Sequence, residues 1–390
     1  MSRADRNHID LSMLIAVLIL MLLSLGIVYS ASSTYAQAKY GESEHMLANH
    51  AIKVLLGVLA LFIGMRIDYH HLQKLTKPAL LVSVGLLLIT LILGGETKGS
   101  TRWLRFGSLG FQPSELAKYA LLFHLSTLLA VKGDLIRDFK KGFIPMMVWI
   151  GAVTLLVLLQ PNFSMGAMIF LLSCVMLFVG NARMSHLGLT FAVLVPVLLI
   201  YMMSAPYRRE RIMSYIGGGS KDSVKSHYQV DQGKIAFGNG GIFGVGPGES
   251  KQRDFFLPES YGDFVFSIVG EEYGFVGTIS FLGLFLFILI RGFKIAKFAH
   301  DAFGRQLAIA VTCAITLYAL INAGVTLGIL PTTGLPMPFV SYGGTSMVFS
   351  ACAIGVLLNI SSQTDLHPRA RQVPVLGSVN AGEANVGKVY

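Results

Sequence analysis

The chain has 390 residues, of which 53% are hydrophobic and only 13% are charged. Soluble domains carry about 25% charged residues, so this composition excludes an ordinary water-soluble fold and indicates an all-α, polytopic membrane protein. The net charge of +10 comes from basic residues spread through short gaps between apolar segments, a pattern that favours membrane topology over a nucleic-acid groove.

The apolar segments predict about ten membrane-spanning helices, at about 20 residues for each span. The expected spans are 11–31, 52–67, 78–94, 113–131, 144–160, 163–181, 187–204, 262–290, 306–328 and 342–360. They form one membrane domain over residues 11–360, which follows a short N-terminal segment, 1–10. One long loop, 205–261, separates the seventh and eighth spans. The polar tail, 361–390, is expected to be disordered.

The distribution of Lys and Arg predicts that both termini lie in the cytoplasm. With the N-terminus inside, 17 basic residues fall on the inner side and five in the short outer gaps. This is the asymmetry of the positive-inside rule, and it requires an even number of spans. The long loop then lies outside, where its own basic residues carry little weight because long loops translocate largely regardless of charge.

The start of the fourth span is the first candidate site, because ionisable groups are rare and costly in lipid. It reads Gln112-Pro113-Ser114-Glu115, and Pro113 suits the first turn of a helix. Glu115 and Lys118 are three residues apart and share a helix face. Two interpretations stay open: a helix start with a local ion pair, or part of a functional site.

A second candidate lies just upstream, where residues 101–106 alternate basic and apolar side chains. As an interfacial segment on the outer surface, it would hold Trp103 at headgroup depth and offer Arg102 to phosphates. An aromatic anchor with snorkelling arginines is the alternative interpretation.

The long loop contains a basic run, 206–211, that includes Arg211, and a run of glycines, 238–248. Glycines of this kind can form backbone nests that bind anions, but the strand and helix that flank a phosphate-binding loop are absent from the pattern. Flexible turns are therefore the favoured interpretation of the glycine run.

Asp263 falls where the long loop becomes the eighth span. It could be a helix N-cap. The alternative is a partly desolvated carboxylate with a raised pKa, which would suit a general base. Glu271 and Glu272, two turns deeper, are predicted to be buried structural partners.

The last candidate is the segment 328–346, which contains three prolines and four glycines. Irregular backbone at membrane depth needs protein cover or a cavity. Under the predicted topology this segment, the long loop, the Arg102 segment and the start of the fourth span all lie on the outer side. We therefore expect them to form one outer-facing site.

At these segments the sequence resembles the SEDS family of shape, elongation, division and sporulation proteins, whose best-known members are FtsW and RodA. The resemblance covers about residues 10–362. It rests on FQPSELAK (111–118), the glycine run 241–248, FLPESYGDFVFSIVGEEYGFVG (256–277) and a segment, 328–346, that ends in PFVSYGGTS. The tail and the loop favour the division type, FtsW, over the elongation type, RodA.

The resemblance implies a peptidoglycan glycosyltransferase of the bacterial cytoplasmic (inner) membrane that polymerises lipid II and releases undecaprenyl diphosphate. It implies a class B penicillin-binding protein as partner, together with other membrane proteins of the division or elongation machinery. It makes Asp263 the essential carboxylate and places Glu115 and Lys118 in the cavity near it. Gln112, Glu259 and Ser341 lie in the matching motifs and are predicted to bind substrate.

The hypothesis is that Asp263 accepts the proton of the attacking sugar hydroxyl. Arg102, Lys118 and Arg211 would stabilise the diphosphate, and a divalent cation, Mg or Mn, is a further candidate for that role. One carboxylate suffices for inversion because the leaving group departs as an anion, unlike the paired carboxylates of glycoside hydrolysis.

Two positions depart from the pattern of many family members. Asn162 stands where an Asp is common, so an acidic role is excluded there. Gly262 stands before Asp263 where a Thr is frequent, which puts a hydroxyl contact in doubt.

Two other functions stay open. A flippase for lipid-linked precursors would carry internal repeats and a site at the membrane midplane, and the sequence has neither pattern. A non-catalytic division scaffold would dock through small residues such as Gly274 and Gly277, but it has no need of a polar outer site.

Overall fold

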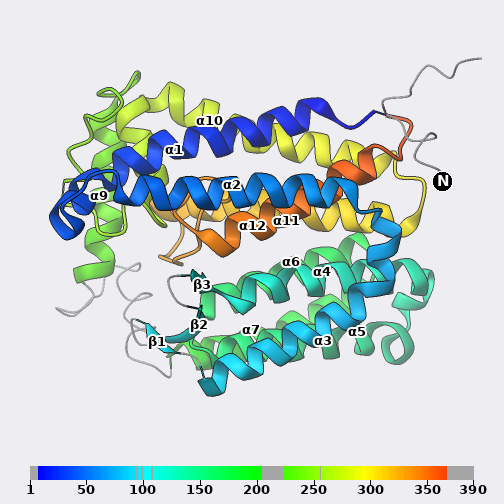
Figure 1. Ribbon diagram of the computed structural model, residues 1–390. Helices are drawn as coiled ribbons and strands as arrows, with labels where there is room; N and C mark the ends of the chain where they lie inside the picture. Colours follow the sequence, from blue (N-terminus) through cyan, green and yellow to red (C-terminus); the bar gives the residue numbers. More distant parts are fainter. Residues whose placement is uncertain are drawn as a thin grey trace, which may run out of the picture.

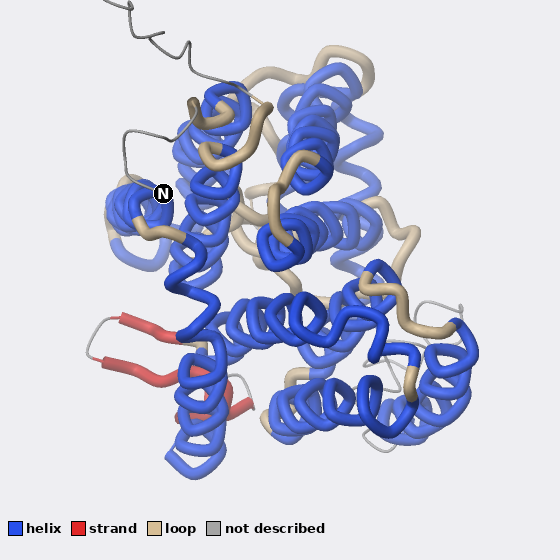
Figure 2. Tube along the Cα trace, turned by 90° about the vertical axis from the view of Figure 1, so that its right-hand side faces the viewer, coloured by secondary structure: helices blue, strands red, loops and turns tan. Residues whose placement is uncertain are grey.

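The computed structural model describes residues 8–93, 95–97, 100–106, 109–203, 224–254 and 256–366. The chain forms a bundle of long helices with a small sheet at one edge (Figures 1 and 2). The α-helices are α1 (Leu11–Tyr40), α2 (His45–Arg66), α3 (Tyr69–Leu93), α4 (Pro113–Lys132), α5 (Ile144–Leu159), α6 (Phe163–Val179), α7 (Met184–Met203), α9 (Val224–Gly240), α10 (Val265–Lys297), α11 (Ala302–Thr326) and α12 (Gly344–Ser361).

Eight helices of the described chain are long and apolar enough to cross a membrane, namely α1 to α5 and α10 to α12. Two shorter apolar helices lie in α6 and α7. In chain order, these elements correspond to the predicted spans, so the prediction of a polytopic helical fold is confirmed. The long loop differs from the expectation, because it contains a further helix, α9.

Three short strands follow α3, where the sequence analysis expected no regular structure. They are β1 (Gly95–Thr97), β2 (Ser100–Phe106) and β3 (Leu109–Phe111), paired antiparallel in that order. These short strands are a local addition to the predicted helical fold. The alternation of basic and apolar residues that we assigned to the membrane interface is the period-two pattern of a strand.

The sheet is tied to the start of α12 by one side chain. The hydroxyl of Thr345 donates to the carbonyl of Gly110 at 3.2 Å and accepts from the backbone N–H of Gln112 at 3.3 Å. These two bonds bring β3 and the start of α4 against the segment that joins α11 to α12.

Helices α2 and α12 pack closely because both carry glycine at their crossing. A Cβ atom at Gly64 would lie 2.5 Å from the carbonyl oxygen of Cys352, and one at Gly355 would lie 2.2 Å from that of Leu61. Small residues let helix backbones approach in this way, which strengthens dispersion contacts where lipid offers no hydrophobic driving force.

Helix α10 is broken at Gly274, whose φ of +64° is left-handed. The loop 241–246 docks at this break, and the N–H of Val245 donates to the carbonyl of Glu271 at 3.0 Å. A Cβ at Gly274 would lie 2.3 Å from the backbone nitrogen of Gly244. The glycine run does form turns, as predicted, but the turns of 241–246 are fastened to α10 by hydrogen bonds. Gly274 contacts the chain's own loop and does not offer an open docking face.

The start of α1 and the end of α12 meet at one end of the bundle, which we call the Asp10 end. The buried carboxylate of Asp10 pairs with Arg291 at 2.7 Å, and the Asp10 N–H donates to the hydroxyl of Ser361 at 3.0 Å. Ser361 to Thr364 are buried, so the packed chain extends into the predicted tail. Residues 367–390 lie outside the described residues.

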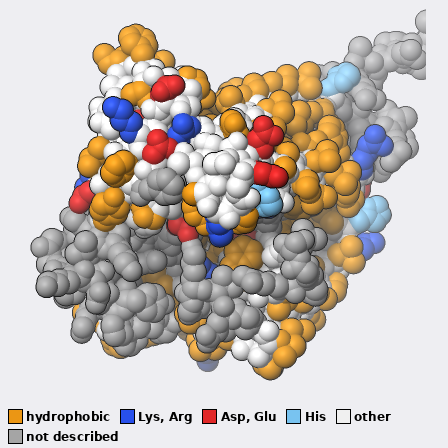
Figure 3. All heavy atoms as spheres, turned by 60° about the vertical axis from the view of Figure 1, so that its left-hand side comes forward, with side chains coloured by type: hydrophobic (Ala, Val, Ile, Leu, Met, Phe, Trp, Pro, Cys, Tyr) orange, Lys and Arg blue, Asp and Glu red, His pale blue; other side chains and the backbone are white. Residues whose placement is uncertain are grey.

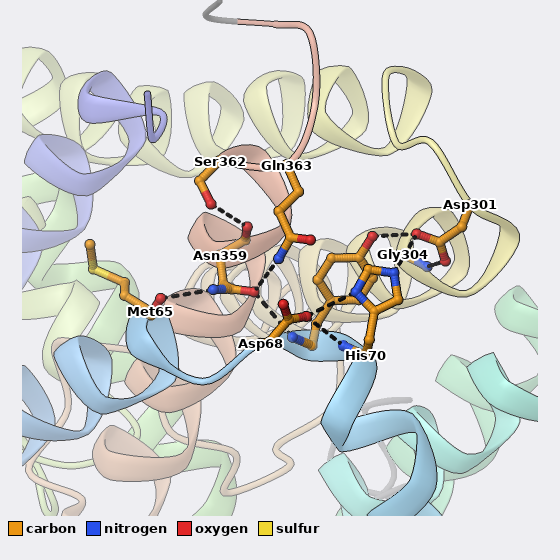
Figure 4. A network of polar contacts seen from close by, with 9 residues as sticks. Met65, Asp68, His70, Asp301, Gly304, Asn359, Ser362 and Gln363 are labelled. Atoms are coloured by element: carbon orange, nitrogen blue, oxygen red, sulfur yellow. Dashed lines mark hydrogen bonds and ion pairs between the residues drawn. The ribbon is translucent and has the colours of Figure 1, made fainter. Parts of the chain in front are cut away.

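A polar network at the same end joins α2, α3, α11 and α12 (Figure 4). Asp68 accepts hydrogen bonds from the backbone N–H of His70 at 3.0 Å and from its ring Nδ1 at 2.8 Å. The other ring nitrogen of His70 lies 3.6 Å from Asp301. Burial by itself would raise the pKa of Asp68, but the hydrogen bonds from His70 and Gln363 outweigh it and lower the pKa to about 2.

This lowered pKa predicts a pH-dependent contribution to stability. Because the folded-state pKa lies below the unfolded value of about 3.9, Asp68 stabilises the fold above pH 4, and the contribution is lost as the pH falls from about 4 to about 2. Asp68→Asn should lower the thermal midpoint in detergent at pH 7, and the gap to wild type should close toward pH 2.5. The exposed Asp134→Asn is the control. A gap that does not change with pH would contradict the assignment.

Candidate functional site

The candidate site lies at the opposite end of the bundle, which we call the Asp263 end (left in Figure 1). It comprises the end of α1, the start of α2, the sheet, the starts of α4 and α10, and the hairpin 327–343 between α11 and α12. Side chains of both charges gather on this end, beside a mainly hydrophobic flank (Figure 3).

Asp263 is half-buried and precedes the N-cap of α10, which is Phe264. The interpretation of Asp263 as the helix cap was therefore wrong. The side-chain amide of Asn322 in α11 donates to the carbonyl of Asp263 at 2.7 Å and to that of Leu335 at 2.9 Å. Helix α11 thus holds the start of α10 and the hairpin together through main-chain atoms, which leaves the Asp263 carboxylate out of this link.

The hairpin approaches the carboxylate at Gly334. This residue has a φ of +70°, a left-handed conformation that glycine adopts without steric cost. A Cβ atom at Gly334 would lie 3.3 Å from Oδ2 of Asp263. The absence of a side chain therefore lets the hairpin backbone pass directly beside the carboxylate.

Glu115 and Lys118 form an ion pair in α4, with 2.7 Å between Nζ and Oε2. Their side chains are only 1% and 2% exposed, and the ammonium lies 4.0 Å from the ring centroid of Tyr318. Tyr318 and Asn322 are four residues apart on one face of α11, so that face runs from the ion pair to Asp263. The charge of Lys118 is already balanced by Glu115.

The pair predicts a large, non-additive effect on stability. Removing one partner of a buried ion pair costs about 3–5 kcal/mol because the other charge is left unpaired. We therefore expect Lys118→Met to lower the thermal midpoint in detergent strongly, and the double variant Glu115→Gln/Lys118→Met to melt nearer to wild type. Lys74→Met, at an exposed position in α3, controls for loss of charge. Additive effects of the two substitutions would contradict the pairing.

Two of the predicted substrate residues shape the backbone around Asp263. The hydroxyl of Ser341 is buried and accepts from the N–H of Met337 at 2.8 Å, which closes a turn of the hairpin. The carbonyl of Glu259 accepts from the N–H of Gly262 at 2.8 Å, in a turn where Glu259 has a φ of +58°. Both lie at the Asp263 end, and their contact with substrate stays a prediction.

For the other predicted substrate residues, Gln112, Arg102 and Arg211, the structure gives fewer contacts. Gln112 occupies the N-cap position of α4, and its carbonyl accepts from the N–H of Glu115 at 3.1 Å. Arg102 lies in β2 and is half-buried. Arg211 lies outside the described residues, so its predicted contact with the diphosphate stays a prediction.

A cluster of aromatic rings and one lysine was missed by the sequence analysis. The N–H of Tyr342 donates to the carbonyl of Tyr261 at 2.9 Å, and their rings meet edge to face at 5.8 Å. Burial raises the pKa of both phenols, so they stay neutral at physiological pH. Nζ of Lys53 lies 3.3 Å from the ring centroid of Tyr342. The only signal was a single charge at the outer edge of the second span, where Lys53 is one of the five basic residues of the short outer gaps.

The two glutamates of α10 are structural, as predicted. Glu271 accepts from the amide of Asn239 at 3.1 Å and from the N–H of Gln252 at 3.2 Å. Glu272 accepts from the hydroxyl of Ser30. Both carboxylates are buried. Glu271 fastens the loop before α10, and Glu272 ties α10 to α1.

The sequence analysis named a divalent cation as a candidate, and metal ions in proteins are held by clusters of ligand side chains. No three His, Cys, Asp or Glu side chains gather there to hold a metal ion. The predicted divalent cation therefore stays a prediction.

Comparison with known proteins places the fold and the sequence in one family. Residues 10–366 match the model of the FtsW, RodA and SpoVE family, described as cell cycle proteins. The chain is 38% identical over 356 residues to a probable peptidoglycan glycosyltransferase FtsW of Geobacter metallireducens, covering 91% of this chain and 95% of that protein. It is 36% identical over 354 residues to stage V sporulation protein E of Bacillus subtilis, covering 90% and 96%.

Solved structures agree with this placement. A chain of a peptidoglycan synthase complex, described as coordinating polymerisation and crosslinking, superposes with a TM-score of 0.75 at 27% identity over 91% of this chain and 98% of that one. A substituted form of RodA from Thermus thermophilus superposes with a TM-score of 0.68 at 25% identity over 92% and 98%.

Proposed function

Because this chain belongs to the FtsW, RodA and SpoVE family of multi-pass membrane proteins, we propose that it is a peptidoglycan glycosyltransferase that polymerises lipid II. The names of its FtsW relatives support this activity at 36–38% identity over most of the chain. The proposed location is the bacterial inner membrane, with both termini in the cytoplasm and the Asp263 end facing outward.

The observation that carries the mechanism is the setting of Asp263. Its carboxylate lies beside the backbone of Gly334, and its main chain is held by Asn322. A half-buried carboxylate at the end of a membrane bundle can reach a sugar that projects from a lipid carrier. A general base must be fixed within hydrogen-bond reach of the proton that it removes, and the links to α11 and the hairpin supply that fixation.

The proposed step forms one bond and breaks one. A sugar hydroxyl oxygen of one lipid II molecule attacks the anomeric carbon of another, and its proton passes to the Asp263 carboxylate. The bond between that carbon and the diphosphate oxygen breaks, and the electron pair leaves with undecaprenyl diphosphate. No general acid is required, because the diphosphate departs as an anion.

The ion pair in α4 supports a different role for Lys118 from the one we first predicted. An ammonium that already faces Glu115 at 2.7 Å adds little net positive charge for a diphosphate. We propose that the pair shapes the floor of the site, while Arg102 and Arg211 remain candidates for the leaving group.

The partner proposed for this activity is a class B penicillin-binding protein. The synthase complex that this chain resembles couples polymerisation to crosslinking, and other membrane proteins of the division machinery are further proposed partners.

The decisive experiment is polymerisation of purified lipid II by the full-length protein in detergent or liposomes, with and without the partner and with Mg²⁺, Mn²⁺ or a chelator. We expect glycan strands in at least one condition that contains the partner. Transbilayer movement of a labelled lipid II analogue in the same liposomes, with no strand formation in any condition, would instead support a flippase.

A further inference from the structure

We propose that Lys53 and Tyr342 form a phosphate-binding subsite at the Asp263 end, a role that takes over the diphosphate contact first assigned to Lys118. The ligand class is a phosphate ester or diphosphate carried on a lipid. This inference rests on the proposed function, since it assigns the leaving group of that reaction to a place in the structure.

Lys53 places a positive charge against an aromatic ring. Its ammonium lies over the face of Tyr342, 3.3 Å from the ring centroid. In the part of the chain that the structure describes, no carboxylate lies within ion-pair distance of it and it has no side-chain hydrogen bond. A ring face binds one side of an ammonium and leaves the other N–H donors for another group.

Lys53 differs from Lys118 in its exposure and in its partners. Both lysines contact a tyrosine ring, but Lys118 is 2% exposed and bonded to Glu115, whereas Lys53 is half-buried. A cation within a membrane span is costly and needs an anionic or polar partner. Lys53 therefore offers an uncompensated positive charge, and Lys118 does not.

The proposed subsite is connected to the chain segment that carries Asp263. The Lys53 side chain passes the start of α12, where a Cβ atom at Gly344 would lie 3.4 Å from its Cδ. Tyr342 is bonded through its main chain to Tyr261, two residues before Asp263. A continuous set of contacts thus connects the free ammonium to the segment that carries the base.

Helix α2 places no negatively charged side chain next to Lys53 that could neutralise its ammonium. His50, one turn before Lys53, is fully buried, and its Nε2 lies 2.9 Å from the hydroxyl of Ser24. That hydroxyl donates to the carbonyl of Met21 at 2.6 Å, so Nε2 carries the proton and donates to Ser24. The His50 ring therefore contacts the Tyr342 ring, with 5.8 Å between the centroids, and it adds no negative charge beside Lys53.

The test compares Lys53→Gln and Lys53→Arg with wild type in the lipid II polymerisation assay with the partner. A charge-assisted hydrogen bond to the departing diphosphate predicts a kcat/KM about tenfold lower or more for Lys53→Gln, and near-normal kinetics for Lys53→Arg. The control is Lys251→Gln, because Lys251 is exposed in the loop before α10. An unchanged kcat/KM for Lys53→Gln, or an equal loss for Lys53→Arg, would overturn the subsite.

A binding measurement separates this inference from the proposed function. Undecaprenyl diphosphate, undecaprenyl phosphate and vesicles with or without phosphatidylglycerol are titrated against wild type and Lys53→Gln. Weaker binding of the undecaprenyl phosphates to Lys53→Gln supports a lipid-carrier subsite even if no polymerisation occurs. A Lys53-dependent response to phosphatidylglycerol alone supports a phosphate subsite that takes a bilayer headgroup. Equal binding by both proteins in every arm overturns the proposal.

Discussion

Asp263→Asn is expected to reduce the rate of lipid II polymerisation by about 10²–10⁴-fold, the usual contribution of a general base. The substitution keeps the size of the side chain and removes its capacity to accept the proton. Because Asn322 bonds the carbonyl of residue 263 rather than its carboxylate, the fold should be retained. The measurement is strand formation by the full-length variant with its partner, next to a thermal unfolding curve.

A matched change tests whether loss of any outer carboxylate has the same effect. Asp254 lies in the loop before α10, where it is exposed and accepts from the hydroxyl of Thr34 at 2.6 Å. Asp254→Asn should leave the rate within about twofold, since surface substitutions away from special features have small effects. Near-normal polymerisation by folded Asp263→Asn would remove this residue from the mechanism.

Gly355→Ala is expected to destabilise the protein although alanine is the better helix former. The new Cβ atom would lie 2.2 Å from the carbonyl oxygen of Leu61 and 3.0 Å from Cα of Gly64, so α2 and α12 must move apart. Overpacking of this kind costs about 1–3 kcal/mol. The expected result is a lower thermal midpoint in detergent and lower yield.

The comparison for this prediction is Gly85→Ala in α3. A Cβ atom there meets nothing within 4 Å, so the substitution should be neutral or slightly stabilising, because glycine is less favourable than alanine in a helix by about 0.5–1 kcal/mol. Equal thermal midpoints for the two variants would contradict the close crossing of α2 and α12.

The spans and the site end could be predicted because both depend on local composition. Apolar segments of membrane length mark α1 to α7 and α10 to α12 in the right order, although single ends of the predicted spans differ from the observed helices by up to nine residues. Asp263 was recognisable because a carboxylate at the boundary between a loop and a span is rare. The strands were missed because six alternating residues also fit an interfacial segment. The docking of 241–246 was missed because it depends on a break in a helix that follows thirty residues later.

The sequence by itself determined that this is a polytopic helical membrane protein and which segments carry its polar candidate residues. This is because the transfer of each side chain between water and lipid is a property of that residue and its neighbours. Only the tertiary structure decided how those groups are paired. Glu115 neutralises Lys118, while Lys53 meets Tyr342 across almost 290 positions of the chain. Such pairings are set by the packing of whole helices, and the local sequence pattern does not encode them.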